Sequence, residues 1–139
     1  MYQCFVKEGL VSDSVRNELA KEITQIHCQA TGVPPAFVRA MFIELPYGTS
    51  YTAGEPSEAS VINGKIRAGR PLEARQQMIA ELAEMWKRLT GQSEHELVIA
   101  LEELASDTIL EEGLIMPNPG EETDWFMRNY QHLAALGVV

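Results

Sequence analysis

The sequence predicts an α+β domain of two layers, in which tandem β-α-β repeats form a four-stranded sheet with two helices on one face. Three observations lead to this fold. The chain repeats itself once, each half passes from strand to helix and back to strand, and 139 residues with 45% hydrophobic content suffice for one core. We expect a single domain over 1–139, with a first unit over about 1–59, a second over about 60–106 and a tail over 107–139.

The repeat is clearest where Thr31–Leu45 is set above Thr90–Leu104, a spacing of 59 residues from Thr31 to Thr90. Both segments begin with Thr-Gly and end with Glu-Leu. The same spacing superposes helix positions that lie upstream. These pairs are Arg16 with Arg75, Ile23 with Leu82, and Ile26 with Met85. Matches spread over both elements indicate a duplication.

The first half begins with a β-prone run, Tyr2–Val6. Ser12 can then cap a helix whose apolar residues recur every three to four positions, and Thr31-Gly32 ends it. Phe37–Leu45 is the closing strand. The apolar helix positions are Val15, Leu19, Ile23, Ile26 and Ala30.

The second half repeats this order, with Val61–Ile66 as its first strand and Leu97–Leu104 as its last. Pro71 lies in the first turn of the helix between them, and Gly91 ends it. One helix face carries Met78, Leu82, Met85, Trp86 and Leu89. Strands joined through a helix of this length should pair in parallel with a right-handed crossover.

Phe37–Ile43 is nearly continuous in apolar residues, which is typical of a strand buried on both sides. Two helices cover only one face of the predicted sheet. We therefore expect a homo-oligomer whose subunits meet sheet against sheet or edge against edge.

Pro46–Pro56 is rich in turn residues and predicts a loop or a small hairpin. The repeat does not account for the tail, which Pro117–Gly120 interrupts. Glu122–Leu136 is expected to form a last helix whose large side chains are core or interface anchors. These are Trp125, Phe126, Tyr130 and Leu133.

The net charge of −9 disfavours nucleic acid or an anionic membrane as a partner, because both require a basic face. No long apolar run or signal peptide is present, and we expect a cytoplasmic protein. Cys4 and Cys28 are expected to stay reduced. The three histidines are scattered without metal-ligand spacing, so no metal site is predicted.

Arg67 and Arg70 lie where a strand ends and a helix begins, a place that suits a carboxylate or phosphate. Two arginines at this spacing are also common on surfaces. His27 lies near the end of the first helix and could be structural. Glu111 begins a turn and could act as a base or orient water, although such carboxylates are usually solvated.

In this order, these residues resemble the tautomerase superfamily and, within it, the cis-3-chloroacrylic acid dehalogenase group. The most specific segments are Ala20–His27, Arg67–Arg70 and Ile109–Gly120, followed by Trp125-Phe126. The resemblance implies a homotrimer that binds small unsaturated or 2-keto carboxylic acids without metal or organic cofactor.

By the same resemblance, Arg67 and Arg70 would hold the substrate carboxylate, His27 would assist binding and polarisation, and Glu111 would activate water. The chain departs from the family at two positions. Met1 stands one position after the family's N-terminal proline, so a primary amine with an ordinary pKa of about 8 would be a weak substitute base. Ala100 replaces a tyrosine that helps to activate water.

Three functions therefore stay open. The first is an enzyme that tautomerises, hydrates or hydrolytically dehalogenates a small acid. The second is a non-catalytic carboxylate-binding paralogue, and the third is an oligomeric scaffold. At the spacing of the repeat, Arg67 and Arg70 fall on Glu8 and Val11, so we expect one asymmetric site per subunit.

Overall fold

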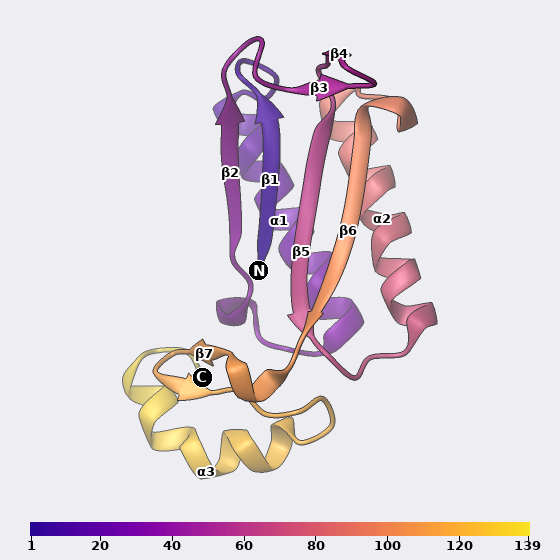
Figure 1. Cartoon of the computed structure of the whole chain (residues 1–139). Coiled ribbons are helices and arrows are strands. Elements are labelled where there is room, and N and C mark those ends of the chain that lie inside the picture. Colours follow the sequence, from indigo (N-terminus) through magenta and orange to yellow (C-terminus); the bar gives the residue numbers. More distant parts are fainter.

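The computed structural model describes all residues, 1–139, and confirms the predicted α+β fold. Four strands form one mixed sheet in the order β2-β1-β5-β6. Both long helices cover the same face of this sheet (Figure 1). The bounds are β1 Tyr2–Lys7, α1 Asp13–Thr31, β2 Ala40–Leu45, β5 Ser60–Arg67, α2 Leu72–Thr90 and β6 Leu97–Leu104.

Each half is a parallel pair joined through its helix, β1 with β2 and β5 with β6. The halves join through β1 and β5, which run antiparallel with Tyr2 opposite Gly64. The beginning of β1 and the ends of β5 and β6 consequently lie at the same edge of the sheet (Figure 1).

The duplication extends to the hydrogen bonds that end each helix. Both α1 and α2 have 19 residues, and each is followed by a glycine in the left-handed region, Gly32 at φ 74° and Gly91 at φ 77°. Each glycine N–H donates to the carbonyl four residues earlier. A 3₁₀ turn follows in both halves, over Pro35–Phe37 and Glu94–Glu96.

Two boundaries differ from those expected. Phe37 lies in the 3₁₀ turn rather than in a strand, and β2 begins only at Ala40. Pro71 caps α2 from just outside the helix and is not in its first turn. Its fixed φ of −57° is compatible with either position, so sequence alone does not separate them.

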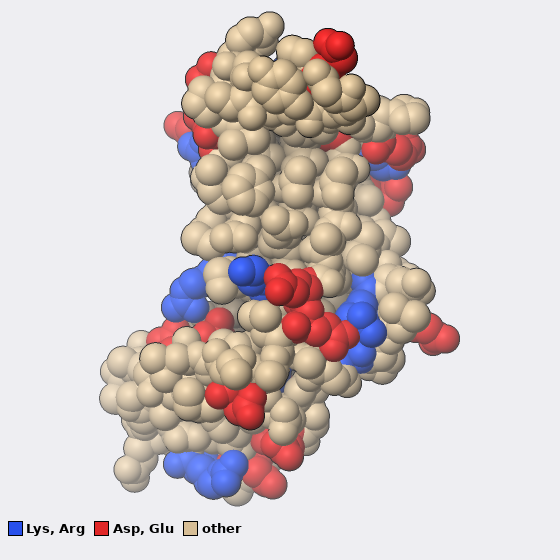
Figure 2. All heavy atoms as spheres, viewed as in Figure 1, with Lys and Arg blue, Asp and Glu red and all other residues tan.

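The main core lies between the sheet and the helices and includes the fully buried residues Tyr2, Cys4, Leu19, Ile62 and Trp86. The opposite face of the sheet is apolar and uncovered, since Met41 is 41% and Val98 is 56% exposed. Figure 2 shows a band without charged side chains across this face. No other element of the same chain therefore covers the outward apolar side of β2.

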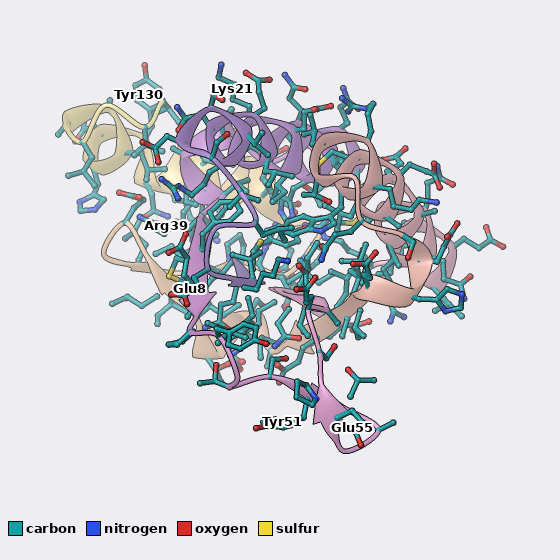
Figure 3. The ribbon with its side chains drawn as sticks, turned by 90° about the horizontal axis from the view of Figure 1, so that it is seen from above. Glu8, Lys21, Arg39, Tyr51, Glu55 and Tyr130 are labelled. Atoms are coloured by element: carbon teal, nitrogen blue, oxygen red, sulfur yellow. The ribbon has the colours of Figure 1, made fainter.

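The connection between the halves forms the predicted small hairpin, β3 Tyr51–Thr52 with β4 Glu55–Pro56. Seen from above, this hairpin projects away from the rest of the protein, with Tyr51 and Glu55 near its tip (Figure 3).

None of the helices is long and apolar enough to cross a membrane.

The tail folds into a small unit at the lower end of the sheet (Figure 1). It consists of a 3₁₀ turn, Ser106–Thr108, a hairpin of β7 Leu110–Glu111 and β8 Leu114–Ile115, and α3 Glu122–Ala135. A second core joins this unit to the first 3₁₀ turn through Phe37, Met116, Trp125 and Leu133. Tyr130, also expected to be an anchor, is 59% exposed in the single chain.

The two copies diverge at the C-terminal end of each helix. Where the first copy has His27 and Val33, the second has Trp86 and Gln92. The Gln92 side-chain oxygen accepts hydrogen bonds from the Trp86 indole N–H at 2.8 Å and from the Ser60 hydroxyl at 2.7 Å. All three side chains are buried, so this network fills the place that the first copy leaves for a site.

Replacing Gln92 with leucine should destabilise the fold, because Trp86 and Ser60 would both lose their shared acceptor. Two buried donors without partners cost about 2–4 kcal/mol, which urea unfolding of Gln92→Leu would detect. The matched control is Gln77→Leu on the exposed side of α2, with an expected change within about 0.5 kcal/mol. Equal losses in the two variants would contradict this account.

Candidate active site

A cavity of about 50 Å³ lies at the sheet edge where β1 begins and β5 and β6 end. The five residues expected from the sequence, Met1, His27, Arg67, Arg70 and Glu111, all line it. Lys65 also lines the cavity, and the other walls are apolar, formed by Val33, Phe37, Ile66, Leu104, Ile109 and Met116. Both copies and the tail therefore contribute to one site.

Met1 is fixed by backbone pairing that extends the β1–β5 ladder. Its amine donates to the Lys65 carbonyl at 3.0 Å, and the Lys65 N–H donates to the Met1 carbonyl at 2.8 Å. Burial lowers the pKa of the Met1 amine, an effect that nearby Glu111 opposes and Arg39 reinforces. The ordinary pKa expected from the sequence is thus corrected downward, which increases the unprotonated fraction at neutral pH.

His27 is buried at the lower end of α1 and bonded to Tyr2. The Tyr2 hydroxyl lies 3.0 Å from His27 Nδ1, and the two rings meet edge to face. Burial, the chain amine and the two arginines lower the pKa of His27 to about 4. Burial also raises the pKa of Tyr2, so its hydroxyl keeps its proton. When this hydroxyl donates to Nδ1, the neutral ring carries its proton on Nε2.

Arg67, the last residue of β5, is 8% exposed and bonded within the protein. One guanidinium nitrogen donates to the Pro117 carbonyl, and another pairs with the Glu122 carboxylate at 2.8 Å. Both partners belong to the tail. Arg67 therefore holds the tail against the sheet edge as well as lining the cavity.

Arg70 lies in the loop before α2, and its guanidinium forms no ion pair or hydrogen bond. Its Nε is buried without any partner. Burial and the neighbouring charge of Arg67 lower the pKa of Arg70, although a guanidinium stays charged in proteins. An unpaired cation at a cavity wall is suited to bind an anion.

Glu111 reaches the cavity from the β7–β8 hairpin. The turn at its tip has two residues in the left-handed region, Glu112 at φ 51° and Gly113 at φ 77°, as tight hairpin turns require. Arg39 pairs with the Glu112 carboxylate at 3.1 Å, and His132 Nε2 lies 2.7 Å from the Glu112 carbonyl. Burial raises the pKa of Glu111, which favours a role in proton transfer.

Two contributions to the site were missed by the sequence reasoning. Tyr2 has the alternating pattern of a core strand residue, and nothing in that pattern indicates a bond to His27. Glu122 was expected only as the first residue of the last helix. Ala100, where the family has a tyrosine, lies on the uncovered sheet face opposite Asn63 and does not line the cavity of its own chain.

No group of three or more His, Cys, Asp or Glu side chains is arranged to hold a metal ion. The titratable groups that line the cavity are two guanidinium groups, a lysine amine, a neutral imidazole, a carboxyl group and the chain amine.

Residues 1–130 match the family model described as "Putative oxalocrotonate tautomerase enzyme". No curated protein matches the chain. Among solved structures, native Ps01740 is 33% identical, with a TM-score of 0.78 over 79% of this chain and 98% of its own.

Two other solved structures share the fold at lower identity. N1, a member of the cis-3-chloroacrylic acid dehalogenase family, is 23% identical, with a TM-score of 0.87 over 91% of this chain and 90% of its own. A "fused 4-OT wild type symmetric trimer" is 21% identical, with a TM-score of 0.73 over 79% of this chain and 89% of its own. The chain thus belongs to the tautomerase superfamily, in the family of that model, and shares its fold with the cis-3-chloroacrylic acid dehalogenase group.

Proposed function

We propose that the protein is an enzyme that acts on small unsaturated or 2-keto carboxylic acids by tautomerisation, hydration or hydrolytic dehalogenation. One observation carries this proposal: the unpaired Arg70 guanidinium lines the same small cavity as an amine of lowered pKa, a neutral imidazole and a half-buried carboxyl group. Such a set combines an anion anchor with groups able to accept and donate protons.

In this proposal Arg70 holds the substrate carboxylate, with Arg67 beside it. In a tautomerisation, the neutral Met1 amine takes a proton from the carbon next to the keto group, and the electron pair moves onto the keto oxygen. His27 stabilises that oxygen by donating from Nε2. The amine then returns the proton at oxygen or at another carbon, which restores the enzyme.

For addition to an unsaturated acid, Glu111 would orient water and accept its proton as the oxygen attacks the β-carbon, while the π electrons move to the α-carbon and the protonated Met1 amine delivers a proton there. If the β-carbon carries a halogen, the resulting halohydrin then expels halide and a proton to give a carbonyl group. The amine bond to the Lys65 carbonyl is compatible with a base, since a neutral primary amine retains its lone pair while one N–H donates. No metal or organic cofactor enters either scheme.

The second candidate function is a carboxylate-binding paralogue without turnover. Ala100 favours this alternative, because its methyl group cannot activate water as a tyrosine hydroxyl can. Calorimetry with small acids, together with turnover assays on enol and 3-haloacrylate substrates, separates the two functions. Sequencing the native N-terminus establishes whether Met1 supplies the amine.

We also propose that the protein is a homotrimer. The uncovered apolar face of the sheet supports an oligomer, and a protein of the same fold is described as a symmetric trimer.

Replacing Arg70 with glutamine should weaken carboxylate binding at least about tenfold, because the unpaired charge would be lost. The expected kinetic effect is a higher KM at little change in melting temperature. The control is Arg128→Gln on α3, outside the cavity lining, with an unchanged KM. An unchanged KM in Arg70→Gln would refute the anchor role.

Acid should destabilise the protein through His27. Its pKa is about 4 in the folded protein against 6.5 in the unfolded chain, so the unfolded chain takes up the proton first as pH falls. The contribution of neutral His27 to the free energy of unfolding is fully present above pH 6.5. Up to about 3 kcal/mol of it is lost as the pH falls from 6.5 to 4. Urea unfolding across this range should show a weaker pH dependence in His27→Gln.

The control for this titration is His95→Gln, which alters an exposed histidine in the second 3₁₀ turn. It should retain the wild-type pH dependence. If His27→Gln retained it as well, the neutral buried imidazole would be excluded.

A charge on the uncovered sheet face should disrupt the trimer. Val98 and Leu72 are both 56% exposed, but Val98 lies on this face, whereas Leu72 begins α2. Light scattering should give a mass of three chains for wild type and Leu72→Glu, and a smaller mass for Val98→Glu. A trimeric Val98→Glu would place the interface elsewhere.

A further inference from the structure

The two arginines of the cavity differ in their internal partners. Arg67 has two, the Pro117 carbonyl and the Glu122 carboxylate, whereas Arg70 has none. A guanidinium already paired with a carboxylate has little net charge to offer a second one. The cavity therefore has two arginines but only one unpaired guanidinium.

Glu122 is held firmly at this position. Its Oε1 lies 2.8 Å from Arg67 Nη2, and its Oε2 accepts the Gly120 N–H at 2.6 Å. Burial alone would raise the pKa of Glu122, but bonds from its own backbone N–H, Arg67 and Gly120 hold that pKa below its ordinary value. The side chain is ionised at neutral pH and does not line the cavity, so it acts on a ligand through Arg67.

We propose that Glu122 is a specificity-determining positioning residue: by neutralising Arg67, it restricts the cavity to acids with a single carboxylate and an apolar remainder. The proposal rests on the carboxylate-binding function proposed above. It assigns carboxylate binding to Arg70 and gives Arg67 a supporting role.

The walls around Arg70 support this selectivity. Six apolar side chains line the cavity, so the part of the substrate beyond its first carboxylate meets mainly hydrocarbon. A second carboxylate there would be desolvated and would approach Glu111 and Glu122. Lys65 also lines the cavity, so the selectivity requires that the apolar walls and these two carboxylates outweigh its charge.

Butyrate and succinate test the proposal, because these four-carbon acids differ in whether the far end is a methyl group or a second carboxylate. Their dissociation constants would be measured by NMR titration of the His27 ring signals in the full-length protein. Wild type should prefer butyrate. Glu122→Gln frees the charge of Arg67 and should shift the affinity ratio toward succinate at least about tenfold.

The matched control is Glu121→Gln, which makes the same change at the adjacent exposed residue and should leave the ratio as in wild type. Glu122→Asp keeps the charge and should retain most of the preference for butyrate, which provides a test if Glu122→Gln does not fold. The proposal is overturned if Glu122→Asp loses the preference for butyrate to the extent expected when the charge itself is removed.

Three outcomes separate this inference from the proposed function. If wild type binds butyrate but Glu122→Gln keeps the wild-type ratio, the role of Glu122 is wrong while carboxylate binding stands. If wild type prefers succinate, Arg67 is available to ligands and the inference fails. If neither acid binds, the proposed function itself fails.

Discussion

Strands β1 and β5 pair in opposite directions at the centre of the sheet, and Met1 extends this ladder by two hydrogen bonds with Lys65. Because of this pairing, the beginning of the first copy and the end of the second meet at one edge. The chain amine, the end of β5 with Arg67, and the tail that follows β6 are thereby brought together. A parallel join would have placed Met1 and Arg67 at opposite edges, and no shared cavity could form.

The elements of the fold could be predicted from the sequence because they depend on local signals. Ser12, Gly32 and Gly91 act at helix ends, and helix periodicity identifies the faces that enter the core. The family resemblance then selected His27, Arg67, Arg70 and Glu111 among residues that spacing alone leaves ambiguous. The cavity that they share follows from tertiary pairing between segments far apart in the chain.

The interactions that the sequence did not indicate are those between side chains of different elements. Tyr2 appears in sequence as one more inward strand residue, yet its hydroxyl is hydrogen-bonded to the buried ring of His27. Glu122 appears in sequence as the first residue of a helix, yet it is the partner of a buried arginine. In both cases the residue type is uninformative until a residue at least 25 positions away becomes its neighbour.

The two similar halves of the chain form one cavity rather than two because their side chains differ at corresponding positions. In the second copy, Trp86, Gln92 and Ser60 occupy the positions of His27, Val33 and Met1, and their hydrogen bonds fill the space with a stable network. The corresponding positions therefore form core in one copy and a cavity in the other. The filled copy also contributes Arg67, whose burial requires a carboxylate partner because an unpaired buried charge is costly. Glu122 meets that requirement, so the ion pair that stabilises the tail also sets the charge that the cavity presents to a ligand.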